Sequence, residues 1–176
     1  MDIKFCTQCG SPVIKRIPEN DTHERYVCTH CRHTHYQNPK IITGCLVYQE
    51  NRVMLCKRAI EPRFGLWTIP AGFMENSENT KTAAVRETHE ESGASIKFGE
   101  LFFFANLPRV NHVYILYLAE LLHTQFNPGS ESSEIKLYTE NQLPWDNLAF
   151  YSAKVAIECF YKDLKHGKFI LHEMDF

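Results

Sequence analysis

The sequence predicts an α+β protein with a small N-terminal module at residues 1–36 and a larger domain at residues 37–176. Three observations support this: two C-x2-C pairs near the start, β-rich runs from residue 41 onward, and two later segments with helical patterns. The chain has 176 residues, of which 44% are hydrophobic. This suits one compact domain with a small appendage, so disorder and fibrous repeats are poorly supported.

Four cysteines of the first module form two pairs, Cys6-Thr-Gln-Cys9 and Cys28-Thr-His-Cys31, with 18 residues between them. This spacing is typical of a structural zinc ribbon, because one tight turn within each pair aims both sulfurs at a tetrahedral cation. Four thiolates leave no open coordination position, so we expect a structural Zn²⁺ that stabilises a segment too small to fold alone. Redox-active or metal-free thiols are the alternative interpretation.

The other residues of this module do not indicate a nucleic-acid partner. His30, His33 and His35 are expected to be exposed loop residues rather than metal ligands. Residues 1–40 carry six Lys and Arg against four acidic residues, and the whole chain has a net charge of −2. No run approaches the roughly 18 apolar residues of a membrane helix, and the start lacks the apolar stretch of a signal peptide. We therefore expect a cytoplasmic protein that does not bind membranes.

The elements of the larger domain follow a turn-prone segment at residues 36–40. Residues 41–48 and 52–57 predict two strands joined as a hairpin. Further strands are expected at 66–69, 95–105, 112–122 and 135–139, and a helix is expected at 149–165. Three cysteines in these segments have apolar neighbours and are expected in the core: Cys45, Cys56 and Cys159.

The chemistry is concentrated in residues 70–94. Residues 79–92 predict a helix that ends at Gly93. Glu87, Glu90 and Glu91 share one helical face, where like charges repel unless a cation binds them. Carboxylate oxygens suit Mg²⁺ or Mn²⁺, which bridge proteins to substrate phosphates. A solvated acidic face is the alternative for these three residues alone.

The run Gly72-x5-Glu78-x7-Arg86-Glu87-x2-Glu90-Glu91-x-Gly93 resembles the complete signature of the Nudix hydrolases. The resemblance implies a Nudix fold, in which helices sandwich a mixed β-sheet, and hydrolysis at phosphorus in a nucleoside diphosphate derivative. It departs at Thr88, where the family has a bulky aliphatic residue. It also implies roles for individual residues: Glu87 and Glu91 as metal ligands, Glu90 as ligand or base, the carbonyl near Gly72 as a further ligand, Glu78 and Arg86 as a structural ion pair, and Gly72 and Gly93 as turn residues.

Residues outside this run complete the expected site. Glu131, in the turn-rich segment 127–138, matches the position where a zinc-ribbon relative places another metal ligand, although a solvated loop acid is the alternative. Arg58, Arg63 and Trp67 flank the run and are candidates for binding the diphosphate or stacking on a base. For Trp67 a core position is the alternative, and for Arg58 and Arg63 solvated charges are.

The order of ribbon and signature resembles the NADH pyrophosphatases, but their SQPWPF-type run is replaced by LFFFANLPRVNH at 101–112. A plant chloroplast type of FAD and ADP-ribose diphosphatase is more similar, through KFC-x2-CG, CTHC, YQNPK, PAG, PG-x-ES-x-E and LAF among other segments. The expected reaction is therefore hydrolysis of FAD to FMN and AMP, or of ADP-ribose to AMP and ribose 5-phosphate. The alternatives are NADH hydrolysis, removal of an NAD cap from RNA, and a noncatalytic nucleotide sensor. A small-molecule dinucleotide is the expected partner, and the oligomeric state stays open, a homodimer included.

Overall fold

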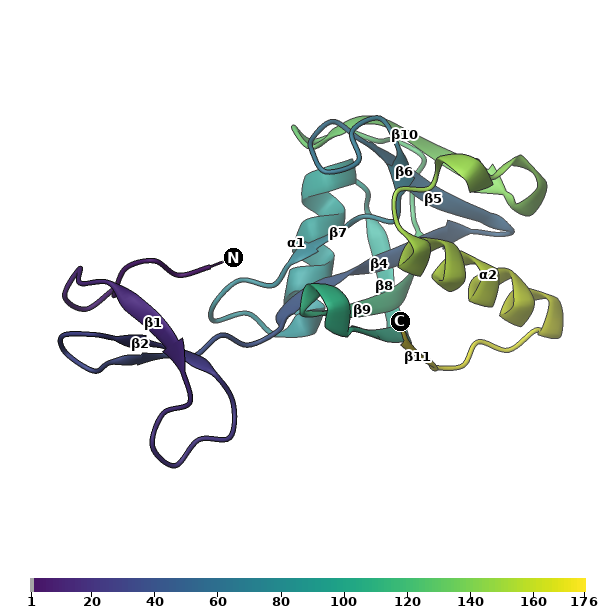
Figure 1. Ribbon diagram of the computed structural model, residues 1–176. Coiled ribbons are helices and arrows are strands. Elements are labelled where there is room, and N and C mark those ends of the chain that lie inside the picture. Colours follow the sequence, from purple (N-terminus) through teal and green to yellow (C-terminus); the bar gives the residue numbers. More distant parts are fainter. Residues whose placement is uncertain (1) are drawn as a thin grey trace. The chain divides into compact units, whose positions relative to one another are not determined.

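The structure is a computed structural model that describes residues 2–176 (Figure 1). The chain divides into two compact units, Met1–Pro39 and Lys40–Phe176. Each unit has its own sheet, of three and eight strands respectively. No helix in the described part of the chain is long and apolar enough to cross a membrane.

The first unit is a three-stranded antiparallel sheet of β1 (Val13–Arg16), β2 (Arg25–Cys28) and β3 (Thr34–His35). Its interior is small, and Val27 is among the few fully buried side chains. His30 and His33 are exposed as expected, but the expectation for His35 was wrong. His35 is buried because β3 pairs with β2, which sets His35 opposite Tyr26.

The second unit is built on a mixed sheet with the strand order β10-β5-β4-β9-β8-β11, in which β4 runs parallel to β9 and β8 parallel to β11. The strands are β4 (Lys40–Gln49), β5 (Arg52–Arg58), β6 (Trp67–Thr68), β7 (Ala71–Phe73), β8 (Ile96–Leu107), β9 (His112–Leu121), β10 (Ser132–Thr139) and β11 (His172–Asp175). The prediction did not include β7 and β11. Each has only three or four residues, with a glycine or charged side chains, and each forms only by pairing with a longer strand.

The sheet opens into a fork between β4 and β5. These strands pair directly only beside their turn, at Tyr48↔Val53 and Gln49↔Arg52. Farther along, β7 pairs with β4, and β6 pairs with β5. The segment that connects β6, β7 and the following helix is therefore held inside the fork, which positions the acidic residues described below.

One helix covers each face of the sheet (Figure 1). Helix α1 (Thr80–Ser92) begins at Asn79, whose side chain accepts a hydrogen bond from the Thr82 N–H at 3.0 Å, and ends at Gly93 in the left-handed conformation. The sequence predicted a helix over residues 79–92 that ends at Gly93, and the observed helix begins one residue later because Asn79 is its cap. Helix α2 (Tyr151–His166) begins two residues later than expected, because Phe150 is extended.

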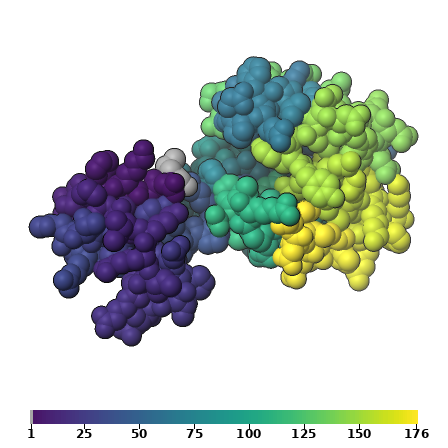
Figure 2. Space-filling view, in the orientation of Figure 1, coloured from purple at the N-terminus to yellow at the C-terminus, as the bar shows by residue number. Residues whose placement is uncertain are grey.

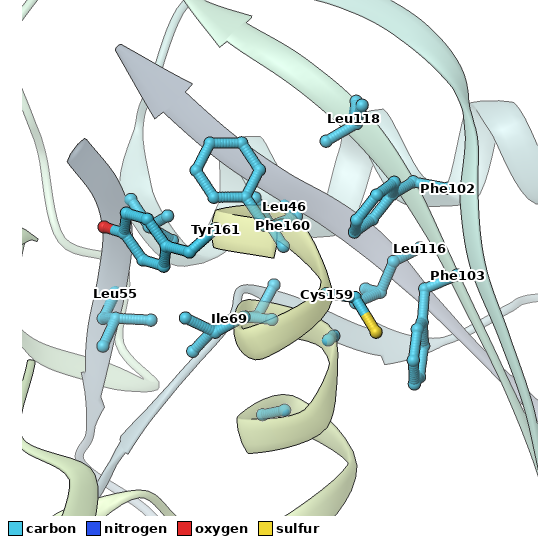
Figure 3. Close-up of a cluster of buried hydrophobic side chains, with 14 of the residues drawn as sticks. Leu46, Leu55, Ile69, Phe102, Phe103, Leu116, Leu118, Cys159, Phe160 and Tyr161 are labelled. Carbon is cyan, nitrogen blue, oxygen red and sulfur yellow. The ribbon is translucent and has the colours of Figure 1, made fainter. Parts of the chain in front are cut away.

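The larger hydrophobic core lies between the sheet and α2. Figure 3 shows its central side chains, with Phe160 and Tyr161 of α2 among Leu46, Leu55 and Phe102 from the strands. Cys159 lies at this interface, and Cys45 and Cys56 are also buried as expected. Burial raises the pKa of the Cys45 thiol to about 11, so it is protonated and unreactive at neutral pH. Short 3-10 helices at Pro108–Val110, Glu140–Gln142 and Trp145–Asn147 complete the unit.

Candidate active site

The last turn of α1 places Glu91 inside the fork of the sheet. Only 8% of Glu91 is exposed, and the backbone of Ala71 in β7 hydrogen-bonds to its carboxyl group. Burial raises the pKa of Glu91 to about 8, and the negative charges of Glu87 and Glu131 add to this effect, while the positive charge of Arg58 opposes it. A carboxylate in this position is costly unless a cation neutralises it.

Glu87 lies one turn earlier on the same face of α1, against β7. A Cβ atom built on Gly72 would lie 2.2 Å from Oε2 of Glu87, so the carboxylate fills the space that a side chain would need. Burial also raises the pKa of Glu87, while Arg86 opposes this shift. The absence of a side chain at position 72 thus allows Glu87 to contact the β7 backbone.

Arg86 connects the helix to the preceding loop and uses all five of its N–H donors. Nε and Nη2 bind the two oxygens of Glu78 at 2.7 and 2.8 Å, which is the ion pair that the resemblance implies. Nη1 donates to Glu87 at 2.7 Å and to Glu90 at 2.9 Å, and Nη2 also donates to the carbonyl of Phe73 at 3.2 Å. Arg86 therefore has no donor left for a substrate.

Glu90 differs from its neighbours in exposure. Its side chain is 58% exposed and is hydrogen-bonded to Arg86. Its negative charge raises the pKa of Glu87, whereas the charges that raise the pKa of Glu91 are those of Glu87 and Glu131. The structure thus brings Glu87, Glu91 and Glu131 into one electrostatic cluster and leaves Glu90 at its edge.

Glu131 reaches this cluster because its loop is fastened to the end of α1. The N–H of Asn127 donates to the carbonyl of Ser92 at 2.9 Å, and the N–H of Gly129 donates to the carbonyl of Glu91 at 3.3 Å. A Cβ on Gly129 would lie 1.9 Å from the carbonyl oxygen of Glu90, so only glycine permits this approach. The Glu131 side chain is exposed at the start of β10.

The three candidate substrate-binding residues have different surroundings. Trp67 is only 7% exposed and packs edge-on against Tyr138, so it belongs to the core and does not offer a face to a base. Arg63 is exposed in the loop between β5 and β6. Arg58, at the end of β5, lies close enough to the acidic cluster for its charge to lower the pKa of Glu91.

Phe73 adjoins the acidic run, and its backbone carbonyl accepts a hydrogen bond from Arg86. Phe73 follows Gly72 directly, is partly exposed, and has the Lys40 amino group 4.8 Å from its ring centroid. The His112 ring packs edge-on against it at 5.5 Å. The sequence shows only that an aromatic residue follows the glycine of the acidic run. The contact of Lys40 with Phe73 depends on the pairing of β7 with β4, which the sequence does not show.

The four cysteines of the first unit converge on one point. Their Sγ atoms lie within 4.8 Å of one another, and among residues 2–176 no other group of three or more His, Cys, Asp or Glu side chains does so. The Sγ–Sγ distance is 3.5 to 3.6 Å in each of three pairs, Cys6–Cys31, Cys9–Cys28 and Cys9–Cys31. Tetrahedral zinc with bonds of about 2.3 Å requires sulfurs about 3.8 Å apart, so the cluster fits zinc.

Comparison with protein families identifies both units. The family model described as the Nudix N-terminal zinc ribbon matches residues 4–37, and the model of the NUDIX domain matches residues 38–158. The chain belongs to the Nudix hydrolase family. A crystal structure of a Nudix hydrolase from Nitrosomonas europaea matches 99% of both chains, with a TM-score of 0.94 and 46% identity.

Curated relatives of this Nudix chain have two kinds of name. An ADP-ribose pyrophosphatase of Methanocaldococcus jannaschii is 27% identical over 124 residues, which cover 68% of this chain and 72% of the relative. The NAD-capped RNA hydrolase NudC of Vibrio parahaemolyticus is 29% identical over 147 residues, which cover 81% of this chain. The chain spans about half of that relative, 53% of its length.

Divalent metals are the cofactors of Nudix enzymes, and the acidic cluster suits them. Its donors are carboxylate oxygens without sulfur or imidazole, which is the set that Mg²⁺ and Mn²⁺ prefer. Burial is the main cause of the raised pKa values of Glu87 and Glu91, and the charges of neighbouring carboxylates add to it. A bound cation would offset both the cost of burying these charges and the repulsion between them.

Proposed function

We propose that the chain hydrolyses the diphosphate bond of ADP-ribose or FAD, with AMP as a product. The observation that supports the proposal is the position of Glu87 against β7 and of the buried Glu91 one turn later, with the charges of Glu131 and Arg58 near enough to act on Glu91. Carboxylates that hold metal and a cation that binds phosphate are the two groups that diphosphate hydrolysis needs.

Glu87, Glu91 and Glu131 are the proposed ligands of Mg²⁺ or Mn²⁺, with the carbonyl near Gly72. Glu90 would join them by exchanging its hydrogen bond to Arg86 for the metal. When bound, such ions neutralise the phosphate oxygens and lower the pKa of the attacking water. Glu78 and Arg86 keep the loop and helix in place, and Gly72 and Gly93 allow the close approaches at the two ends of the run.

A carboxylate near the reacting phosphorus takes the proton from water. Glu90 and Glu131 are the two exposed acids of the group, so they can release that proton to solvent, whereas Glu91 is buried. We therefore assign the base to one of these two residues. The four cysteines are proposed to hold a structural Zn²⁺ that takes no part in the reaction, since four thiolates leave no position for substrate.

Removal of the NAD cap from RNA, or hydrolysis of NADH, is the second candidate, because a relative named as an NAD-capped RNA hydrolase matches 81% of the chain. The run LFFFANLPRVNH at 101–112, in place of the NADH-type run, favours ADP-ribose and FAD. The zinc ribbon carries few excess positive charges, which gives long RNA little electrostatic attraction.

A comparison of kcat/KM for ADP-ribose, FAD, NADH and NAD-capped RNA, at one pH with Mg²⁺ and then Mn²⁺, tests this proposal. We expect ADP-ribose or FAD to have the highest value and to yield AMP. A preference of ~10-fold for NADH or capped RNA, about 1.4 kcal/mol in transition-state binding, would replace the proposal with the second candidate.

A further inference from the structure

Arg58 differs from Arg86 in how much of its guanidinium the protein uses. Nε of Arg58 donates to the carbonyl of Pro62 at 2.8 Å. In the part of the chain that the structure describes, residues 2–176, the two Nη groups of Arg58 make no hydrogen bond or ion pair with another residue. An arginine with a fixed stem and four free N–H donors is prepared to bind a planar pair of anionic oxygens.

Phe150 supports the other side of this guanidinium. The Cζ atom of Arg58 lies 5.3 Å from the centroid of the Phe150 ring, in a cation–π contact. Phe150 is 37% exposed and belongs to neither hydrophobic core cluster. Among the described residues its ring makes no contact with another ring. The packing of the core therefore does not explain a phenylalanine at this position.

The backbone around Phe150 is fastened to the strand beside Arg58. The N–H of Ala149 donates to the carbonyl of Trp67 at 2.8 Å, and Leu148 forms a parallel bridge with the same residue. Trp67 in turn pairs with Lys57, which precedes Arg58 on β5. In Figure 2 the blue surface of the segment that follows β5 adjoins the yellow-green surface at the start of α2.

We propose that Phe150 is a positioning residue, whose ring holds the guanidinium of Arg58 in the orientation in which its free Nη groups bind the diphosphate of the substrate. The inference rests on the proposed function and assigns a role to the LAF segment at 148–150, which the proposed site leaves unused. It gives the residue that precedes α2, the helix on the face opposite to α1, a part in substrate binding. Arg58 pairs with Ser132 across β5 and β10, and the N–H of the next residue, Ala59, donates to the carbonyl of Glu131 at 2.8 Å. Arg58 therefore lies beside the loop that carries Glu131.

The first experiment replaces the ring. Phe150→Leu keeps an apolar side chain and removes the π face, so kcat/KM for ADP-ribose should fall about 10-fold. Phe150→Trp should restore the wild-type value, because indole binds cations at least as well. Tyr151→Leu is the matched control: Tyr151 is 68% exposed, contacts Phe176 rather than Arg58, and should tolerate the change. If Phe150→Leu lowers the Tm below the assay temperature, Phe150→Met takes its place.

The second experiment measures whether Phe150 acts through Arg58. Arg58→Ala should lower kcat/KM by about 10²-fold, and adding Phe150→Leu to Arg58→Ala should then cause no further loss. Losses that multiply in the double variant would overturn the proposal, as would a Phe150→Leu protein with wild-type kinetics.

Titration calorimetry should compare the binding of ADP with Mg²⁺ to the wild type, Phe150→Leu, Arg58→Ala and the double variant. We expect Phe150→Leu to weaken ADP binding only when Arg58 is present. The affinity for ADP tests the positioning role of Phe150 separately from the proposed hydrolase function. A wild type that hydrolyses none of the four substrates would contradict the proposed function, while the coupling in ADP affinity would still decide the role of Phe150.

Discussion

The carboxylate of Glu87 occupies the space in which a side chain at position 72 would lie. This relationship joins the β7 backbone to the metal-binding face of α1, and it explains the glycine by a close approach, because Gly72 does not have a positive φ. The backbone at this position thus accepts alanine, and only the Glu87 carboxylate must move.

Gly72→Ala is therefore expected to fold and to lose activity. The new Cβ displaces a proposed metal ligand, and a misplacement of about 1 Å at a reacting centre costs on the order of 10²-fold in rate. The kcat for ADP-ribose and the circular dichroism spectrum measure the two outcomes. In a Glu87→Asp background, with the shorter side chain withdrawn, Gly72→Ala should cause little further loss. A fully active Gly72→Ala protein would show that Glu87 is not held where the structure has it.

Glu91→Gln should greatly reduce catalysis and should stabilise the protein when no divalent cation is added. The amide cannot replace a charged ligand, so we expect turnover to fall by about 10²-fold or more. The folded pKa of about 8 lies above the ordinary value of 4.5, so the wild type loses stability as the pH rises from 4.5 through 8. The variant lacks this loss, and its Tm should exceed that of the wild type at pH 8 but not at pH 4.5. Equal Tm values at both pH values would contradict the burial of a carboxyl group at position 91.

How much of the site the sequence could predict depends on how local each contact is. Glu87 and Glu91 share a face because helical geometry sets it, and Asn79 and Gly93 mark the helix ends through side-chain and backbone preferences. The approach of Glu131 depends instead on backbone hydrogen bonds from Asn127 and Gly129, which no local pattern encodes.

The burial of Trp67, which the sequence left open, and that of His35, which it missed, have the same origin. Trp67 is covered by Tyr138, and His35 by its strand pairing, so partners distant in sequence decide both burials. The contact of Arg58 with Phe150 joins residues that are far apart in the chain. It could be found only once β6 was seen to pair with β5 and to bridge Leu148.

Glu78→Gln should destabilise the protein at neutral pH and have no effect in strong acid. The hydrogen bonds from Arg86, with that from the Glu75 backbone, hold the pKa of Glu78 at about 2, below its ordinary value of 4.5. The stability that this carboxylate contributes is complete above pH 4.5 and is lost as the pH falls through 2. The Tm difference between wild type and variant should therefore disappear as the pH falls from 4.5 to 2. Glu75→Gln, whose side chain is exposed, is the control, and a difference that stays constant with pH would contradict the ion pair.

Thr88→Val should raise the stability of the protein without changing its activity. Thr88 is completely buried between α1 and the sheet, and among residues 2–176 its hydroxyl has no hydrogen-bond partner beyond a weak interaction with the Cys45 thiol. Valine has nearly the same shape and removes a poorly satisfied buried hydroxyl, so the free energy of unfolding should increase by about 1 kcal/mol. Urea denaturation measures this change. A destabilised variant would show that the hydroxyl has a full partner in solution.

Removal of zinc should unfold the first unit and leave the second intact. The ribbon has few buried side chains, whereas residues 40–176 have two hydrophobic core clusters of their own, so only the ribbon depends on metal for its stability. Elemental analysis should find one tightly held zinc per chain, and Cys9→Ser should lose it while Cys159→Ser retains it. Hydrogen exchange after treatment with a strong chelator should show loss of protection in residues 2–39 and retained protection in the core strands β4, β5 and β9. Persistent protection of β1 and β2 in a metal-free protein would contradict the assignment, because four uncoordinated thiols supply no comparable cross-link.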